Sequence, residues 1–187
     1  MLYPSAGHHS KDPGAVANGY TEFELVSDFR DRITEYLDIL NVVYDTDKDH
    51  ETNSQYQGRI RPKLRKGDVV LDNHLDSYNG KVSGVTVFIS NNAGEDSKAF
   101  AKDLSEGISK IMGVTNRGVK KEGDTQHSRI GILNLKGTAA LVEYGFMDNP
   151  NDLKAFLDNR DTLAKFVCSM MLKYDRNQYK DYINGKV

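Results

Sequence analysis

Three residues that can bind a metal or move a proton, His8, His74 and Glu143, each follow a short apolar run of the sequence. The run before His74 contains Val69–Leu71, and the run before Glu143 is Ala139–Val142. Short apolar runs are consistent with buried strands, and open α/β sheets bind their ligands at the carboxyl ends of their strands. We therefore expect the three side chains to meet at one edge of a sheet.

A fourth candidate, Glu22, lies at the expected start of a long helix. Thr21 and Glu24 have the spacing of a capping box, which leaves Glu22 at the first helical position without a capping role. Glu22 precedes Leu25 by three residues, which turns it toward the buried face, and the helix dipole favours its ionised form there. Two imidazoles, one carboxylate and a position left for water are typical of catalytic zinc, because structural zinc sites use four protein ligands.

The composition excludes several classes of function. The 187 residues are 38% hydrophobic and show no repeat, which predicts one globular domain over residues 1–187. The 25 basic and 27 acidic residues give a net charge of -2, so we expect no nucleic-acid partner. No apolar stretch is long enough to cross a bilayer, so we expect no membrane insertion. The single cysteine, Cys168, excludes an internal disulfide and a cysteine zinc cage.

Apolar runs and amphipathic stretches alternate along the chain, which predicts an α/β layer fold. The clearest helix covers residues 21–40, where apolar residues recur at steps of three and four. These residues are Leu25, Phe29, Ile33, Leu37 and Leu40. Further helices are expected over residues 96–112, 151–157 and 162–174, and strands over 41–44, 68–72, 84–89, 130–135 and 138–143. The stretch between the first two strands is polar, and residues 113–126 form a Gly- and Lys-rich loop.

Four segments occur in a characteristic order along the chain. They are Ala6-Gly-His8-x-x-x-Asp12-Pro-Gly-Ala15, Gly19-Tyr-Thr-Glu22, Asn73-His74-Leu-Asp-Ser77 and Leu141-Val-Glu143-Tyr-Gly-Phe146-Met-Asp-Asn149-Pro150. Together they resemble the zinc-dependent N-acetylmuramoyl-L-alanine amidases of the AmiC/CwlV type, also called amidase 3. The resemblance extends from the first residues to about residue 151. It implies a single domain with a twisted, mixed and mostly parallel sheet flanked by helices on both faces, without a separate wall-binding module.

The resemblance also implies roles for the candidate residues. In that family the residues that match His8, Glu22 and His74 bind one Zn²⁺, and the residue that matches Glu143 is the catalytic glutamate. The implied substrate is peptidoglycan, and the implied reaction cleaves the amide bond between the lactyl group of N-acetylmuramic acid and L-alanine. Zinc would supply activated water and polarise the scissile carbonyl, and Glu143 would accept the water proton and pass it to the departing amine.

Two arginines and two sequence departures complete the expected site. We expect Arg117 and Arg129 to hold a substrate carboxylate or to stabilise the tetrahedral oxyanion. His9 and Ser10 stand where the family usually has two glycines, which crowds the loop after the first ligand. The segment 75–79 replaces the usual short Ala-Asn continuation after His74 and is more similar to phage enzymes than to cellular ones.

Two alternatives concern metal binding. His9 is an alternative to His8 as a ligand, although the register of the Asp-Pro-Gly that follows favours His8. Residues 45–51 imitate the start of a calcium loop. However, His50 occupies the position of the required glycine and Tyr56 that of the bidentate glutamate, so we expect a solvated loop.

Other features have simpler structural interpretations. Cys168 lies among apolar residues and is expected in the core. A basic cluster is expected to form a solvated face, with contact to anionic wall polymers as the alternative. It consists of Arg59, Arg61, Lys63, Arg65 and Lys66.

The first seven residues lack the basic and apolar segments of a signal peptide. We therefore expect a monomer made in the bacterial cytoplasm without its own signal peptide, which reaches the cell wall after holin-mediated release, as a phage endolysin does. A cellular amidase is the alternative origin. Two rival functions are a zinc peptidase that acts on wall or free peptides and a non-catalytic wall-binding domain. The latter would not need the full set of metal-binding and catalytic residues.

Overall fold

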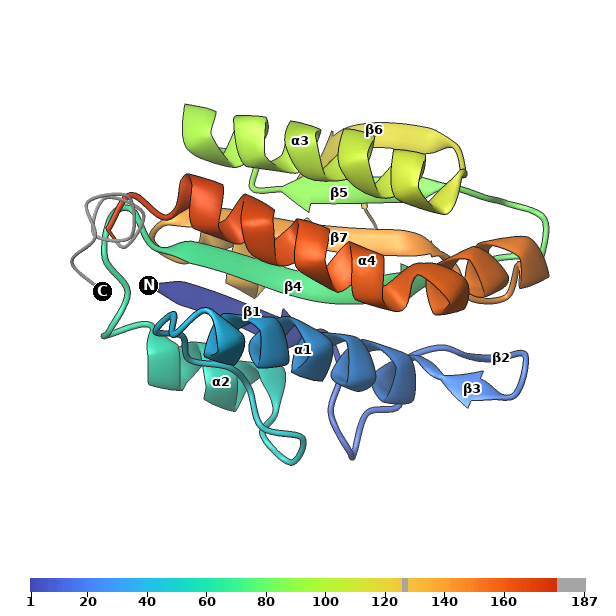
Figure 1. The fold of residues 1–187 in the computed structure, drawn as a ribbon, viewed down its shortest axis with the longest axis horizontal. Coiled ribbons are helices and arrows are strands. Elements are labelled where there is room, and N and C mark those ends of the chain that lie inside the picture. The colour runs from blue at the N-terminus through green and yellow to red at the C-terminus, as the bar shows by residue number, and fades with distance from the viewer. Residues whose placement is uncertain (126–127, 178–187) are drawn as a thin grey trace.

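Five strands form the main sheet in the order β1-β4-β7-β5-β6 in the computed structural model, which describes residues 1–125 and 128–177 (Figure 1). The strands are β1 Leu2–Ala6, β4 Val69–Asp76, β5 Val85–Ile89, β6 Asn116–Lys121 and β7 Thr138–Phe146. β1, β4 and β7 are mutually parallel, whereas β5 runs antiparallel to β7 and parallel to β6. The prediction of a mixed and mostly parallel sheet is confirmed.

Helices cover both faces of this sheet, as expected from the resemblance. The helices α1 Glu22–Ile39, α3 Glu95–Met112 and α4 Pro150–Tyr174 pack on one face, and in Figure 1 they lie in front of the strands. The short helix α2 Asn53–Ile60 and the 3₁₀ turn η2 Gly131–Asn134 pack on the other face. In the described part of the chain, no helix has the length and apolar character needed to cross a membrane.

Helix α1 begins where the sequence predicts. The Thr21 side chain accepts a hydrogen bond from the Glu24 backbone N–H, and the Glu24 carboxylate accepts one from the Thr21 N–H, so the capping box is confirmed. The apolar stripe is buried from Leu25 to Leu37. The prediction is wrong for Leu40, which is the C-cap residue of the helix and is 37% exposed.

The core on the α1 side contains a cluster of three aromatic rings. Phe29 of α1 lies with its ring centroid 4.8 Å from that of Tyr144 on β7 and 5.3 Å from that of Phe156 on α4. The Tyr144 hydroxyl donates to Asn73 Oδ1 at 2.8 Å, which satisfies its buried polar atom. Cys168 is 2% exposed in the same core, as expected. These contacts fix β4 and β7 against the helices.

Several local predictions are wrong for identifiable reasons. Residues 130–135 contain the turn η2 rather than a strand, because a short apolar run fits either structure. Residues 41–44 supply only an isolated bridge, between Tyr44 and Leu2. The expected loop 113–126 contains the edge strand β6. Its lysines, which are common in edge strands, give it no alternation of apolar and polar residues that would predict a strand. Residue 126 lies outside the described residues. The two helices expected after residue 150 are one continuous helix, α4.

A small two-stranded hairpin and two polar networks shape the edges of the fold. β2 Val16–Ala17 and β3 Tyr20–Thr21 pair antiparallel before α1. In the expected solvated loop, Asp47 is in fact 6% exposed and pairs with the buried Arg30 at 3.0 Å. Within the basic cluster, Arg59 is drawn into ion pairs with Asp45 and Glu51 at 2.6 and 2.7 Å. The other members of the cluster are exposed.

Candidate metal centre and active-site cavity

The side chains of His8, Glu22 and His74 converge near the carboxyl ends of β1 and β4. One potential ligand atom from each residue lies within 4.8 Å of the other two. His8 follows β1 by two residues, Glu22 is the first residue of α1, and His74 lies in the second half of β4. The structure therefore brings together the three residues that the sequence predicts as metal ligands.

Glu22 occupies the centre of this group and is 5% exposed. Its Oε2 lies 3.1 Å from His8 Nε2, and its Oε1 lies 3.0 Å from His74 Nδ1. The backbone N–H groups of Ala15 and Leu75 donate one hydrogen bond to each carboxylate oxygen at 3.1 Å. Burial alone would raise the pKa of Glu22, but the contacts with His74 and His8 outweigh it and hold the pKa well below its usual range. Glu22 is thus held ionised, as a metal ligand must be.

Each histidine has a second carboxylate beside its other ring nitrogen. Asp12 Oδ2 lies 3.2 Å from His8 Nδ1, and Asp72 Oδ2 lies 3.2 Å from His74 Nε2. Asp72 is itself positioned by the Ser5 hydroxyl, which donates to Oδ1 at 2.7 Å. Metal-binding histidines commonly have such a carboxylate partner, which fixes the tautomer and the ring orientation.

Glu143 of β7 is the register partner of His74 on the neighbouring strand β4. Its Oε2 is closed off from solvent and has no hydrogen-bond partner among the described residues. Burial raises the pKa of Glu143 to about 8, against the opposing effect of His74 and with a smaller contribution from the Glu22 charge. A carboxyl group with such a pKa can exchange a proton near neutral pH.

The donor set of this centre fits a zinc ion. Two imidazole nitrogens and one carboxylate oxygen are ligands that zinc accepts, and three protein ligands are the number found in catalytic sites. Asp72 supplies His74 with the outer hydrogen bond that is usual in such a site, and the Asp12 carboxylate lies near the outer nitrogen of His8. We therefore take the group as the candidate metal centre.

The centre opens into a cavity of about 670 Å³ on the α2 side of the sheet. Asn53 and Gln57 of α2 line one wall, and the Asn53 side chain donates to Gly7 O at 2.8 Å beside the first ligand. Lys120 of β6 and Arg129, which precedes η2, also line the cavity. Glu143 and the three candidate ligands line the floor, so the cavity can hold a substrate over them.

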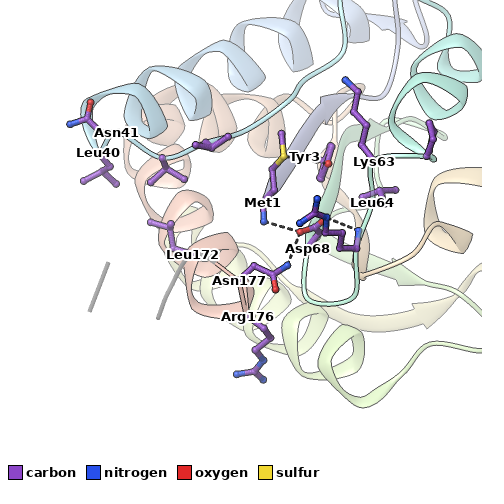
Figure 2. A pocket seen from close by; sticks show the side chains of 14 residues that line it. Met1, Tyr3, Leu40, Asn41, Lys63, Leu64, Asp68, Leu172, Arg176 and Asn177 are labelled. Carbon is purple, nitrogen blue, oxygen red and sulfur yellow. Dashed lines mark hydrogen bonds and ion pairs between the residues drawn. The ribbon is translucent and has the colours of Figure 1, made fainter. Parts of the chain in front are cut away.

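A second cavity of about 860 Å³ lies at the opposite ends of the same strands (Figure 2). It is lined by Met1 and Tyr3 at the start of β1 and by Asp68 before β4, and the Met1 amino group pairs with Asp68 at 2.9 Å. Although it is larger, the described residues around it include no cluster of three metal-binding side chains. The chemistry therefore belongs to the smaller cavity.

The remaining residues predicted for the site lie in different places. Arg129 lines the cavity, and its contact with substrate stays a prediction. Arg117 is not among the lining residues, and its guanidinium lies over the Phe146 ring, 5.1 Å from the centroid. His9 is outside the metal group, and its Nδ1 accepts a hydrogen bond from the Lys11 N–H at 3.3 Å.

Sequence reasoning missed several residues of the site. Asp72 shares a strand face with His74 because the two are separated by one residue, a spacing that could have revealed the pair. Asn53 and Gln57 belong to the missed helix α2, whose Thr52-x-x-Gln55 capping box was a usable signal. Lys120 lies in β6, within the expected loop, and nothing in the sequence alone places it beside the metal centre.

Comparison with known proteins agrees with this geometry. The family Amidase_3, described as N-acetylmuramoyl-L-alanine amidase, matches residues 5–173. The chain therefore belongs to this family, and its enzyme class is that of the N-acetylmuramoyl-L-alanine amidases.

Individual proteins are similar over most of the chain. The germination-specific N-acetylmuramoyl-L-alanine amidase of Bacillus subtilis is 24% identical over 192 residues, covering 93% of this chain and 79% of that protein. Among solved structures, the N-acetylmuramoyl-L-alanine amidase of Clostridium difficile 630 has a TM-score of 0.79 at 18% identity, covering 92% of this chain and 95% of that one. The catalytic domain of the CD27L endolysin, which targets Clostridia difficile, has a TM-score of 0.71 at 21% identity and covers 94% and 98%. The structural likenesses support the fold.

Proposed function

We propose that the chain hydrolyses, with one zinc ion, the amide bond between N-acetylmuramic acid and L-alanine in peptidoglycan. The observation that carries this proposal is the convergence of His8, Glu22 and His74 beside Glu143 in one cavity. Family membership supports the choice of substrate, because N-acetylmuramoyl-L-alanine amidase is the description of the matching family.

His8, Glu22 and His74 would hold the zinc ion. When bound, zinc supplies Lewis-acid polarisation of the scissile carbonyl and activation of water. The protein contributes orientation, because Asp72 holds the His74 imidazole from its far side and the Asp12 carboxylate lies beside the far side of His8. The hydrogen bond between His74 Nε2 and Asp72 keeps this ring fixed and leaves Nδ1 facing Glu22 at the side where the ion would be held.

Glu143 is proposed as the general base and then the general acid. In its ionised form, which the charge of a bound zinc ion would favour, its unpaired Oε2 can accept the proton of the attacking water. Burial raises the pKa of Glu143, so the proton is released afterwards only as far as the leaving amine takes it. The proton then passes to the nitrogen of the departing L-alanine as the C–N bond breaks, so the carboxylate returns to its starting state. This role is typically worth roughly 10²–10⁴-fold in rate.

The test is digestion of purified peptidoglycan followed by mass spectrometry. We expect stem peptides with a free L-alanine amino group and glycan strands whose reducing ends do not increase. Chelation should remove activity, and added zinc should restore it. The variant His8→Ala should stay inactive with zinc present, whereas His9→Ala should keep the activity, because only His8 joins the metal group.

Other products would support other functions. Free amino acids, or peptides cut within the stem, would indicate a zinc peptidase, and wall binding without any product would indicate a wall-binding domain. Either result would overturn the proposed reaction.

A narrower proposal is a lytic role of the endolysin type. The likeness in fold to the CD27L endolysin catalytic domain supports it, together with the departure at residues 75–79. Expression in a bacterial host with and without a holin tests this role. Lysis that depends on the holin is expected, and lysis by neither combination, despite activity on purified walls, would contradict it.

A further inference from the structure

A row of register partners crosses all five strands on the cavity face of the sheet. Its members, in strand order, are Ser5, Asp72, Leu141, Phe88 and Lys120. The last four of these residues also line the cavity. The row is acidic at β4, apolar at β7 and β5, and basic at β6. The cavity floor therefore has a fixed polarity across the sheet.

Two cations line the cavity near the basic end of the row. Lys120 is half-buried and Arg129 is exposed, and both line the cavity. Within residues 1–125 and 128–177, neither takes part in an ion pair. The nearby Asp124, which also lines the cavity, accepts a hydrogen bond from the Lys121 N–H at 3.0 Å. The two positive charges are thus available to an anionic ligand.

The backbone next to Arg129 is held by a buried carboxylate. Glu122, 2% exposed, accepts hydrogen bonds from the Ile130 N–H at 2.6 Å and from the Asn134 side chain at 2.8 Å. Its other oxygen accepts from the Ser90 hydroxyl and the Asn91 N–H, both at 3.1 Å, beyond the end of β5. Because Ile130 directly follows Arg129, this network fixes the wall from which Arg129 extends.

The span from the catalytic group to the cations matches a short peptide. Lys120 on β6 lies two strands from β7 and in register with Leu141, which is two residues from Glu143. At the usual strand spacing and rise, Lys120 and Glu143 are therefore about 12 Å apart along the sheet. An extended peptide advances about 3.4 Å per residue. The lysine side chain extends from the Lys120 backbone toward the peptide and covers part of the distance between them. A carboxylate one or two residues beyond the scissile amide therefore falls within reach of Lys120.

We infer that Lys120 and Arg129 bind a free carboxylate on the residue that follows L-alanine in the stem peptide, so that the peptide lies toward β6. The glycan then lies toward β1 and α2, where the amides of Asn53 and Gln57 line the wall. The inference rests on the proposed amidase function. It identifies the preferred substrate, because this carboxyl group is free in some peptidoglycans and amidated in others.

The test uses uncross-linked glycan strands whose stems differ only at this group, as carboxylate or as carboxamide. We expect the native enzyme to show a kcat/KM about tenfold higher on the carboxylate, a ratio that corresponds to about 1.4 kcal/mol. In Lys120→Gln/Arg129→Gln the ratio of the two kcat/KM values should fall to about one, because the carboxylate strand loses the two charges that favour it over the carboxamide strand. The charge-retaining variant Lys120→Arg should keep the preference. High salt should weaken it, because Arg129 is exposed.

The matched control is Lys136→Gln/Arg61→Gln, which removes the same two charges from exposed residues outside the cavity. It should keep the tenfold ratio. Equal cleavage of both strands by the native enzyme, or a preference that survives in the Lys120→Gln/Arg129→Gln variant, would overturn this inference and leave the amidase function standing. Failure to cleave either strand would overturn the proposed function and the inference together.

Discussion

Glu143 on β7 lies directly across from His74 on β4 in the parallel register of the sheet. The position of the proposed base relative to the proposed metal ligand is therefore set by strand pairing rather than by a loop. A register slip of one residue would turn the whole strand face over and remove Glu143 from the cavity. The buried aromatic cluster beneath β4 and β7 stabilises this register.

The first prediction separates metal binding from turnover. Glu143→Gln should lower kcat by about 10²–10⁴-fold, because the amide cannot accept the water proton. Zinc content, measured by atomic absorption, should stay at one per chain, since Glu143 is not among the clustered ligand atoms. The exposed variant Glu106→Gln on α3 is the control and should retain full activity. Loss of zinc from the Glu143 variant would make it a ligand and contradict the assignment.

A second prediction concerns the carboxylate that holds His74. Asp72→Asn should weaken zinc binding by about 10–100-fold, because the amide orients the imidazole less firmly. Ser5→Ala should weaken it less, since it removes only the hydroxyl that donates to Asp72. Zinc affinity is measured by competition with a chromogenic chelator.

The control for Asp72→Asn is Asp158→Asn, on the exposed side of α4, where the carboxylate pairs with Lys154. Unchanged zinc affinity in Asp72→Asn, with the fold intact by circular dichroism, would show that Asp72 does not support the ligand.

A third prediction uses the close approach of Gly7 to the centre. A Cβ atom at Gly7 would lie 2.0 Å from His74 Cε1, so Gly7→Ala must displace the ring. We expect loss of zinc and activity with little change in circular dichroism. Gly58→Ala is the matched control, because a Cβ there meets nothing within 4 Å and Gly58 lies inside α2. It should raise the free energy of unfolding by about 0.5–1 kcal/mol. Normal zinc binding by Gly7→Ala would show that the ring has room to move.

Much of the fold follows from local sequence patterns. The apolar stripe and the capping box of α1 are strong signals because each rests on several residues with a fixed spacing. The strand β6 is different, since Lys120 and Lys121 reflect its place at the edge of the sheet. The helix α2 could not be predicted from an apolar stripe, because its buried side consists only of Tyr56 and Ile60.

In the candidate site, too, some residues can be predicted from local sequence patterns and others cannot. His8, Glu22, His74 and Glu143 are found from sequence because each follows a strand or begins a helix in a recognisable motif. Asp72 and Lys120 were not found, because their roles depend on which strands become neighbours. Strand order is a property of the whole chain, so pairwise placement across the sheet cannot be taken from one segment.

The last prediction is the effect of pH on the stability of the metal-free protein. Burial raises the pKa of Glu143 to about 8 from 4.5, so between these values the folded state binds a proton that the unfolded state has lost. Stability should therefore fall as pH rises through this window, by at most about 1.4 kcal/mol per pH unit. Urea unfolding of the native protein and of Glu143→Gln from pH 5 to 9 measures the effect as a difference, because other titrating groups largely cancel. The native protein should become progressively less stable than the variant up to about pH 8, and a difference that is constant with pH would show that Glu143 is not protonated in the folded state.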